Sequence, residues 1–207
     1  AAGTCDVVVR GAVAAPPPYA KGMKVVSLKP GGELLPPAWT PGELSVCSVL
    51  RADPAQSFEA FSGIFDHVAA DDDAGSFEDV IKGLKEDADG PKVDLRKDLV
   101  GQLGDVVTVV TDCVKPVDVK SARQVVVFPV KDSRMAAAAV RDLFRNDPNA
   151  KREQILGREA WVVRPQPKKQ KAGAPKPPPV PNAALCVDTA AGLFYVATQV
   201  GLLERVL

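Results

Sequence analysis

The sequence predicts an α+β domain in which a largely antiparallel sheet carries its helices on one face. Two observations lead to this fold class. From residue 44 onward, the expected elements follow the order β-α-α-α-β-β-α-β-β and then β-β-α. The β-branched runs also come in neighbouring pairs joined by short breaks, which is typical of antiparallel strands. The order is loosely that of a ferredoxin-like core, although three helices stand where that layout has one.

Composition divides the chain into three parts. Residues 1–28 hold two β-like stretches, at 5–13 and 23–28, and we expect them to be the end of a preceding β-rich module. Residues 29–43 are rich in Pro and Gly and are expected to form a connection. The α+β module then spans residues 44–207, and its last helix is cut short. We therefore expect both ends to be cuts in a longer polypeptide.

The module is expected to open with a buried-type strand at residues 44–50 and a helix that ends near residue 68. Asp53 supplies a side chain that can cap this helix, and Pro54 suits its first turn. An aromatic stripe at helical spacing predicts the buried face of the helix. Its members are Phe58, Phe61 and Phe65.

Two further helices are expected before the next strands. Ser76, followed three residues later by Asp79, resembles a capping box and would begin a helix that ends near residue 87. Asp94 can cap a third helix that continues through residue 103. Gly104 would end that helix, because Gly readily adopts the conformation that follows a helix C-terminus.

The second half of the module alternates strands with one helix. Strands are expected at residues 106–113 and 125–130, followed by an Ala-rich helix up to residue 146. Its consecutive Ala residues would let this helix lie close to the sheet. Two hairpins complete the pattern, one turning at residues 157–158 and the other joining 183–187 to 193–198.

A Lys- and Pro-rich loop interrupts the second half of the module. Residues 165–181 hold seven Pro and four Lys but no acidic residue, so we expect a flexible or polyproline II loop. The loop could anchor weakly to an acidic polymer. We favour a solubilising loop tip, because no aromatic side chain is interleaved to stack on a ligand. The lysines of this contact loop are Lys168, Lys169, Lys171 and Lys176.

Few residues offer acid–base chemistry near neutral pH. The chain has one histidine, His67, which follows Asp66 at the end of the Phe-containing helix. A histidine there is favoured by the helix dipole alone. No nucleophile elbow accompanies it. We assign no catalytic residue, and His67 and Asp66 are the weak local candidates.

The four cysteines do not form a metal-binding pattern. They lie dozens of residues apart in or beside expected strands, where a free cysteine is most often a small buried hydrophobe. Disulfides would have three connectivities, among which the sequence does not choose. The acidic run at residues 71–73 lacks the spacing of a calcium loop. No metal or cofactor is expected, and the disulfide candidates are Cys5, Cys47, Cys113 and Cys186.

Charge and hydropathy argue against two classes of partner. The formal net charge is zero, which gives no electrostatic reason to expect nucleic acid. The longest apolar runs fall far short of the roughly 20 residues that a transmembrane helix needs. We therefore expect neither a nucleic-acid partner nor a transmembrane segment in this chain.

Four long stretches resemble a known group of proteins. They are PPAWTPGEL running into SVCSVLRADPAQSFEAFSGIFDHV, KVDLRKDLVGQLGDVVTVVTD, RNDPNAKREQILGREAWVV and GLFYVATQVGLLERVL. The chain resembles large, uncharacterised, exported proteins of planctomycete bacteria, which are similar to a wider domain-of-unknown-function family of bacterial envelope-associated chains. The resemblance covers residues 10–207 and includes no catalytic signature. The Lys/Pro-rich insertion and the four cysteines depart from the group.

The resemblance implies a longer parent protein. Such a parent would have a signal or anchor upstream and sibling α+β modules on either side. It would be periplasmic, extracellular or anchored to the envelope through a segment outside this chain. The resemblance implies no substrate, cofactor or active-site residue.

These observations predict a non-enzymatic structural or binding module of a larger exported or envelope-associated protein. Its expected partners are the neighbouring domains of the parent chain and other envelope proteins. Two alternatives stay open. One is a hydrolase-type enzyme whose site is completed outside this segment. The other is a carrier for an apolar ligand, bound between the Phe-containing helix and the sheet.

Overall fold

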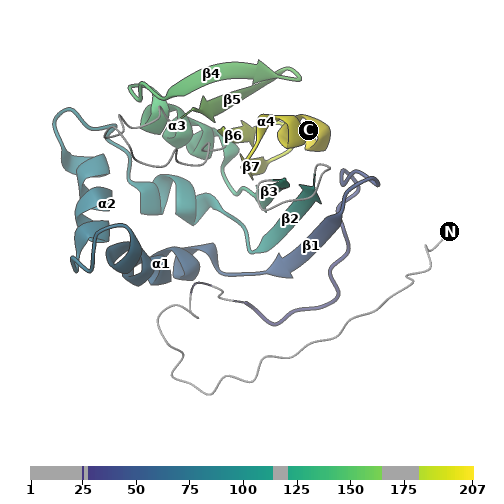
Figure 1. The fold of residues 1–207 in the computed structure, drawn as a ribbon, viewed down its shortest axis with the longest axis horizontal. Helices are drawn as coiled ribbons and strands as arrows, with labels where there is room; N and C mark the ends of the chain where they lie inside the picture. Colours follow the sequence, from purple (N-terminus) through teal and green to yellow (C-terminus); the bar gives the residue numbers. More distant parts are fainter. Residues whose placement is uncertain (1–24, 26–27, 114–120, 165–181) are drawn as a thin grey trace, which may run out of the picture.

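The computed structural model describes residues 25, 28–113, 121–164 and 182–207. Nearly all of the expected N-terminal β-rich module lies outside these residues, as does the whole Lys/Pro-rich loop. The described part contains one antiparallel sheet with helices packed around it (Figure 1). The α+β class is therefore confirmed.

The sheet has seven strands in the order β1-β2-β3-β7-β6-β5-β4, and every neighbouring pair is antiparallel. The expected ferredoxin-like order is not confirmed. The β6–β7 hairpin is the last one in the sequence, but it lies in the middle of the sheet, between β3 and β5. The strands are β1 (Val46–Arg51), β2 (Val106–Cys113), β3 (Ala122–Pro129), β4 (Ala150–Ile155), β5 (Arg158–Val163), β6 (Ala183–Asp188) and β7 (Leu193–Ala197).

Local capping explains where most helices begin. The Asp53 side chain accepts the backbone N–H of Gln56 at the start of α1, and Asp132 accepts that of Met135 at the start of α3. The expected helix over residues 94–103 is instead a π-helical turn followed by a 3₁₀ turn. The helices are α1 (Pro54–Val68), α2 (Ser76–Glu86), π-helix η2 (Leu95–Leu99), 3₁₀-helix η3 (Val100–Gln102), α3 (Ser133–Phe144) and α4 (Val200–Val206).

Both faces of the sheet carry a hydrophobic core. One face packs against α3 and η2 through a cluster that includes Trp161 and Phe194. The other face packs against α4 through a cluster that includes Val110 and Tyr195. The expected placement of the helices on one face therefore holds for α3 but not for α4 (Figure 1). The reason is that the central strands are apolar on both sides, so both faces must be covered.

The connection before β1 is part of the packed structure. Trp39 and Leu44 pack against the α4-side core, and the Trp39 ring meets that of Tyr195 edge-on at 6.3 Å between centroids. Leu28 forms an antiparallel bridge with Ala52, directly after β1. The Pro- and Gly-rich stretch therefore covers the sheet and reaches its β1 edge.

Candidate binding site at the sheet edge

Strand β1 forms one edge of the sheet, and its outer side is only partly paired by the described residues. The Arg51 carbonyl accepts the Lys29 N–H at 2.9 Å, whereas Ala52 pairs inward with Asp105 of the β2 side at 2.8 Å. Because antiparallel residues alternate in the direction of their N–H and C=O groups, Cys47 and Val49 also direct theirs outward. No described strand pairs with them on that side. Within the described part of the chain, two N–H and two C=O groups of β1 are thus left without a strand partner.

The opposite edge of the same sheet differs in chemistry. The β4 sequence AKREQI places Lys151, Arg152 and Glu153 in succession on the edge strand. Charged residues of this kind discourage edge-to-edge pairing. The β1 sequence VCSVLR carries a single charge at its last residue, Arg51. Only β4 therefore shows the charge pattern that protects an edge from added strands.

This position of β1 corrects the expectation of a buried-type strand. Residues Val46 and Ser48 are exposed, and Val46 retains 51% of its accessible surface. Ser48, which alternates with the exposed Val46, is the local signal of this exposure within an otherwise apolar run.

An apolar groove begins where β1 ends. It has a volume of about 400 Å³ and lies between α1, the 3₁₀-helix and the ends of β1 to β3. The described lining residues carry no charge, and Ser57 is the one polar side chain among them. Leu50 belongs to β1, Ala52 follows β1 directly, and Leu28 is the bridge partner of Ala52. The helices contribute Phe58, Phe61 and Val100. The edge strand and the groove are therefore continuous.

The groove exists because α1 is incompletely packed. The rings of Phe58, Phe61 and Phe65 surround Phe77 of α2 at centroid distances of 5.2, 6.2 and 5.6 Å. No residue of α1 is fully buried, and Phe61 keeps 40% of its surface exposed. The expectation of a buried aromatic stripe is therefore wrong, because α1 packs mainly on α2 and the 3₁₀-helix instead of lying flat on the sheet.

The two weak catalytic candidates have separate structural contacts. Asp66 accepts the backbone N–H groups of Gly75 at 2.9 Å and Phe77 at 2.8 Å, which satisfies the N-terminus of α2. His67 Nδ1 contacts the Asp72 carboxylate on the surface, where 71% of the His67 side chain is exposed. This contact raises the pKa of His67, first through the hydrogen bond and then through charge attraction. The structure does not bring the two side chains into one concave site.

The cysteines within the described residues are separate thiols. Cys47, Cys113 and Cys186 are all free, and Cys5 lies outside the described residues. Cys186 is buried, and burial raises the pKa of its thiol to about 11. Such a thiol is protonated and unreactive at neutral pH.

The remaining expectations concern metals and the contact loop. Within residues 25, 28–113, 121–164 and 182–207, no group of three His, Cys, Asp or Glu side chains could hold a metal ion. The lysines of the contact loop lie outside the described residues; they are Lys168, Lys169, Lys171 and Lys176. No helix in the described part of the chain is long and apolar enough to cross a membrane.

Comparison with known proteins adds no assignment. Neither a family model, nor a curated protein, nor a solved structure matches the chain. The resemblance to exported planctomycete proteins therefore stays a prediction.

Proposed function

We propose that the chain is a non-enzymatic binding module of a larger exported or envelope-associated protein, and that it binds by adding an extended apolar segment to β1. The observation that carries this proposal is the continuity between the outer edge of β1 and the apolar groove beside α1. The segment would come from a neighbouring module of the parent or from another envelope protein.

Strand addition uses these two features for different purposes. Backbone hydrogen bonds to Cys47 and Val49 would supply affinity, at roughly 0.5–1.5 kcal/mol each. A side chain inserted into the groove would supply specificity. The bridge between Leu28 and Ala52 supports this mode, because it pairs antiparallel backbone with the same side of the same edge.

The chemistry of the edge defines the segment that fits. The one charged residue of β1, Arg51, already lies 3.7 Å from the Asp105 carboxylate. Among the described residues that line the groove, none is charged. A charged side chain would lose its hydration there without gaining a partner. The expected ligand is therefore uncharged, with alternating apolar side chains.

A displayed library of random decapeptides tests the proposal. We expect the protein to enrich peptides with alternating apolar residues. Val49→Pro should abolish their binding, because it removes an outward N–H without breaking a β2 hydrogen bond. The matched control is Gln154→Pro, since Gln154 alternates with the residues of β4 that bond β5 and so faces outward on the other edge. Urea unfolding would show that both variants fold.

Unlike Val49→Pro, a second variant tests pairing at the β1 edge without removing a backbone N–H. Ser48→Lys places a charge on the exposed β1 edge and leaves every backbone donor intact. It should weaken peptide binding at least tenfold. Enrichment of no peptide, or equal peptide affinity for wild type and Val49→Pro, would overturn the proposal. A concentration-dependent dimer lost in the same variants would identify a second copy as the occupant instead.

The groove also favours a second candidate function, a carrier for a small apolar ligand. The expected position of such a ligand, between the Phe-containing helix and the sheet, coincides with the groove. The neutral fluorophore N-phenyl-1-naphthylamine distinguishes the two functions. A carrier should bind it, lose it in the groove-filling variant Ser57→Trp, and retain it in Val49→Pro. In a strand-binding module, Val49→Pro should weaken peptide binding more than Ser57→Trp does.

The proposed location is supported by the resemblance alone. It is tested by the intact, non-reduced mass of the native polypeptide from envelope and soluble fractions of the source cells. A mass well above 21.8 kDa in the envelope fraction would support a module of an exported parent. A cytosolic species of about this mass would contradict it.

A further inference from the structure

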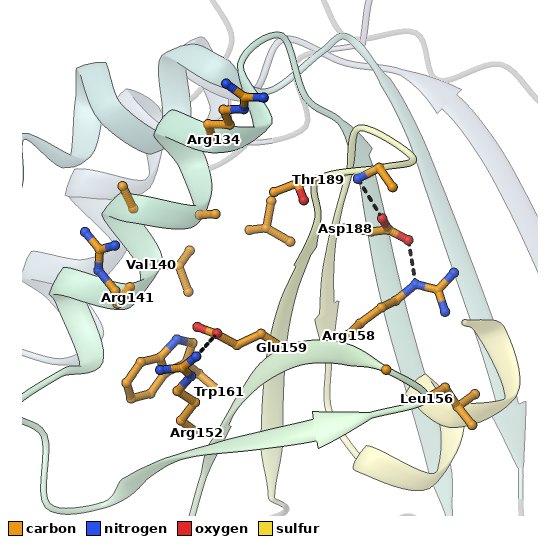
Figure 2. A pocket seen from close by; sticks show the side chains of 15 residues that line it. Arg134, Val140, Arg141, Arg152, Leu156, Arg158, Glu159, Trp161, Asp188 and Thr189 are labelled. Atoms are coloured by element: carbon orange, nitrogen blue, oxygen red, sulfur yellow. Dashed lines mark hydrogen bonds and ion pairs between the residues drawn. The ribbon is translucent and has the colours of Figure 1, made fainter.

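A second groove lies on the α3 face of the sheet, between α3 and the β4–β5 hairpin (Figure 2). Its volume is about 820 Å³. We call it the arginine groove, because its charged lining residues are Arg134, Arg141, Arg152, Arg158, Glu159 and Asp188. It involves β4, β5 and β6, and therefore lies at the other end of the sheet from the β1 edge.

Helix α3 supplies one wall of the arginine groove. Arg134 and Arg141 are separated by two helical turns and flank Ala137 and Ala138, whose short side chains leave room beside the helix. The Arg134 guanidinium has no ion pair or hydrogen bond with another described residue. A cation in the first turn of a helix is also unfavourable for the helix dipole. Helix stability therefore does not explain Arg134.

The carboxylates of the groove are already engaged. Glu159 pairs with Arg152 across the hairpin, and Asp188 accepts Arg158 Nε at 2.5 Å. Asp188 also accepts the backbone N–H groups of Ala190 and Ala191, both at 3.0 Å. Arg158 and Asp188 pair with each other on the α4 face of the sheet, because they alternate with Ala160 and Cys186 of the α4-side core (Figure 2). On the α3 face, the charged groups among the described lining residues are then three guanidinium groups, of Arg134, Arg141 and Arg152, and the Glu159 carboxylate, which leaves an excess of two positive charges. Arg141 pairs with its neighbour Asp142, an exposed contact of little strength.

The hairpin contributes an exposed apolar residue at an unusual backbone position. Leu156 has φ of +48° and occupies the first position of the two-residue turn between β4 and β5. Asn, Asp and Gly are preferred there, because other side chains are strained at positive φ. The Leu156 side chain is 65% exposed and lines the groove. A strained and exposed leucine points to a contact that lies outside the fold.

We propose that the arginine groove binds an acidic segment of a partner protein, with carboxylates on Arg134 and Arg141 and apolar side chains against Leu156. Guanidinium groups suit carboxylates because they can donate two parallel hydrogen bonds. Val140, Trp161 and Val187 give the groove an apolar floor, which fits a peptide better than a small hydrated anion. Arg134 and Arg141 are seven residues apart on α3, which corresponds to about 10 Å along the helix. This distance matches about three residues of an extended peptide.

The probe is a fluorescein-labelled peptide of four Glu-Leu-Ser repeats, whose carboxylates recur every three residues. The reference peptide replaces each Glu with Gln. We expect the Glu peptide to bind at least tenfold more tightly, and the double variant Arg134→Gln, Arg141→Gln to remove that difference. The matched control is Lys151→Gln, which removes a positive charge from the other face of β4. It should change the affinity less than twofold.

Leu156→Asn provides a readout that a purely structural role would not give. Asn suits the turn, so the variant should unfold at higher urea concentration than wild type. It should nevertheless weaken peptide binding at least threefold. Wild-type affinity in Leu156→Asn would contradict the apolar contact.

Three results would overturn the proposal. The Glu and Gln peptides could bind equally, or Lys151→Gln could weaken binding as much as the double variant. Anionic phospholipid vesicles or single-stranded RNA could also bind through Arg134 and Arg141 more tightly than the Glu peptide, which would assign the groove to another class of ligand. The β1 variants do not alter this groove, so failure here is distinguishable from failure of strand addition at β1.

Discussion

The side chain of Asp66, near the end of α1, accepts the backbone N–H of Phe77, in the first turn of α2, at 2.8 Å. The same carboxylate accepts the N–H of Gly75. Ser76 therefore does not cap α2 from within its own sequence, as the capping-box pattern predicts. A residue of the preceding helix does so and fixes the angle between the two helices.

Asp66→Ala should lower the free energy of unfolding by about 1–2 kcal/mol, because two backbone N–H groups at the start of α2 lose their acceptor. Urea denaturation measures the difference. His67→Ala is the neighbouring control and should change stability far less, since its side chain is exposed. Equal losses in the two variants would contradict the capping role of Asp66.

The pKa of His67 should lie above 6.5, because the Asp72 carboxylate binds the protonated ring. A histidine pKa that folding raises gives stabilisation that is complete below the unfolded-state value and is lost as pH rises through the folded-state value. NMR titration of the ring protons measures the pKa. Asp72→Asn should lower it, whereas Asp71→Asn should leave it nearly unchanged. A wild-type value at or below 6.5 would show that the pair does not form in solution.

Arg96 should hold the α1–α2 pair onto the π-helix. Its guanidinium donates to Glu59 at 2.6 and 3.0 Å and to Glu78 at 2.5 Å, and lies 5.9 Å from the centre of the Phe58 ring. Both hydrogen-bonded carboxylates raise the pKa of Arg96, so it is charged at every accessible pH. Arg96→Met should cost about 1 kcal/mol of stability, because the network is partly exposed to solvent.

Lys97→Met is the control for this network, since the exposed neighbour has the same charge. It should leave the urea midpoint within error of wild type. If both variants unfold at the same urea concentration, the Arg96 network does not contribute to stability.

Asp188 should be the carboxylate on which stability depends most. Burial alone would raise the pKa of Asp188, but the Arg158 ion pair and the N–H groups of Ala191 and Ala190 outweigh burial and lower it. Asp188→Ala should cost about 3 kcal/mol, because it leaves Arg158 without its carboxylate and opens the β6–β7 turn. Because the pKa is lowered, the stabilisation is present above the unfolded-state pKa and is lost as pH falls through the folded-state value.

Urea unfolding at pH 7 and at pH 3 measures this effect. The difference between wild type and Asp188→Ala should shrink at the lower pH. The exposed Asp89→Ala is the control and should match wild type at both. A difference that does not change with pH would contradict the ionised state of Asp188.

Local patterns predicted most elements of the fold. The Asp53–Pro54 start of α1, the β-branched strands and the Ala-rich α3 are all where the sequence places them. Each depends on residues close together in the chain. The position of β6–β7 between β3 and β5 depends on long-range packing, which periodicity does not report.

The candidate sites were harder to predict for the same reason. The β1 edge is an edge because none of the later described strands apart from β2 pairs with β1, and the apolar groove forms where residues from distant segments meet. The arginines of the second groove come from α3 and from β4–β5, and none forms a motif along the chain. One local signal was available: Leu156 precedes Gly157 at a turn position that favours Asn or Asp.

Amide hydrogen exchange, followed by NMR with and without a peptide selected from the decapeptide library, tests strand addition at β1. We expect the amides of Cys47 and Val49 to exchange rapidly in the protein alone and to become protected when the peptide binds. The amides of Arg152 and Gln154, on the outer side of β4, should not change. Peptide binding that leaves the amides of Cys47 and Val49 unprotected would contradict strand addition at β1.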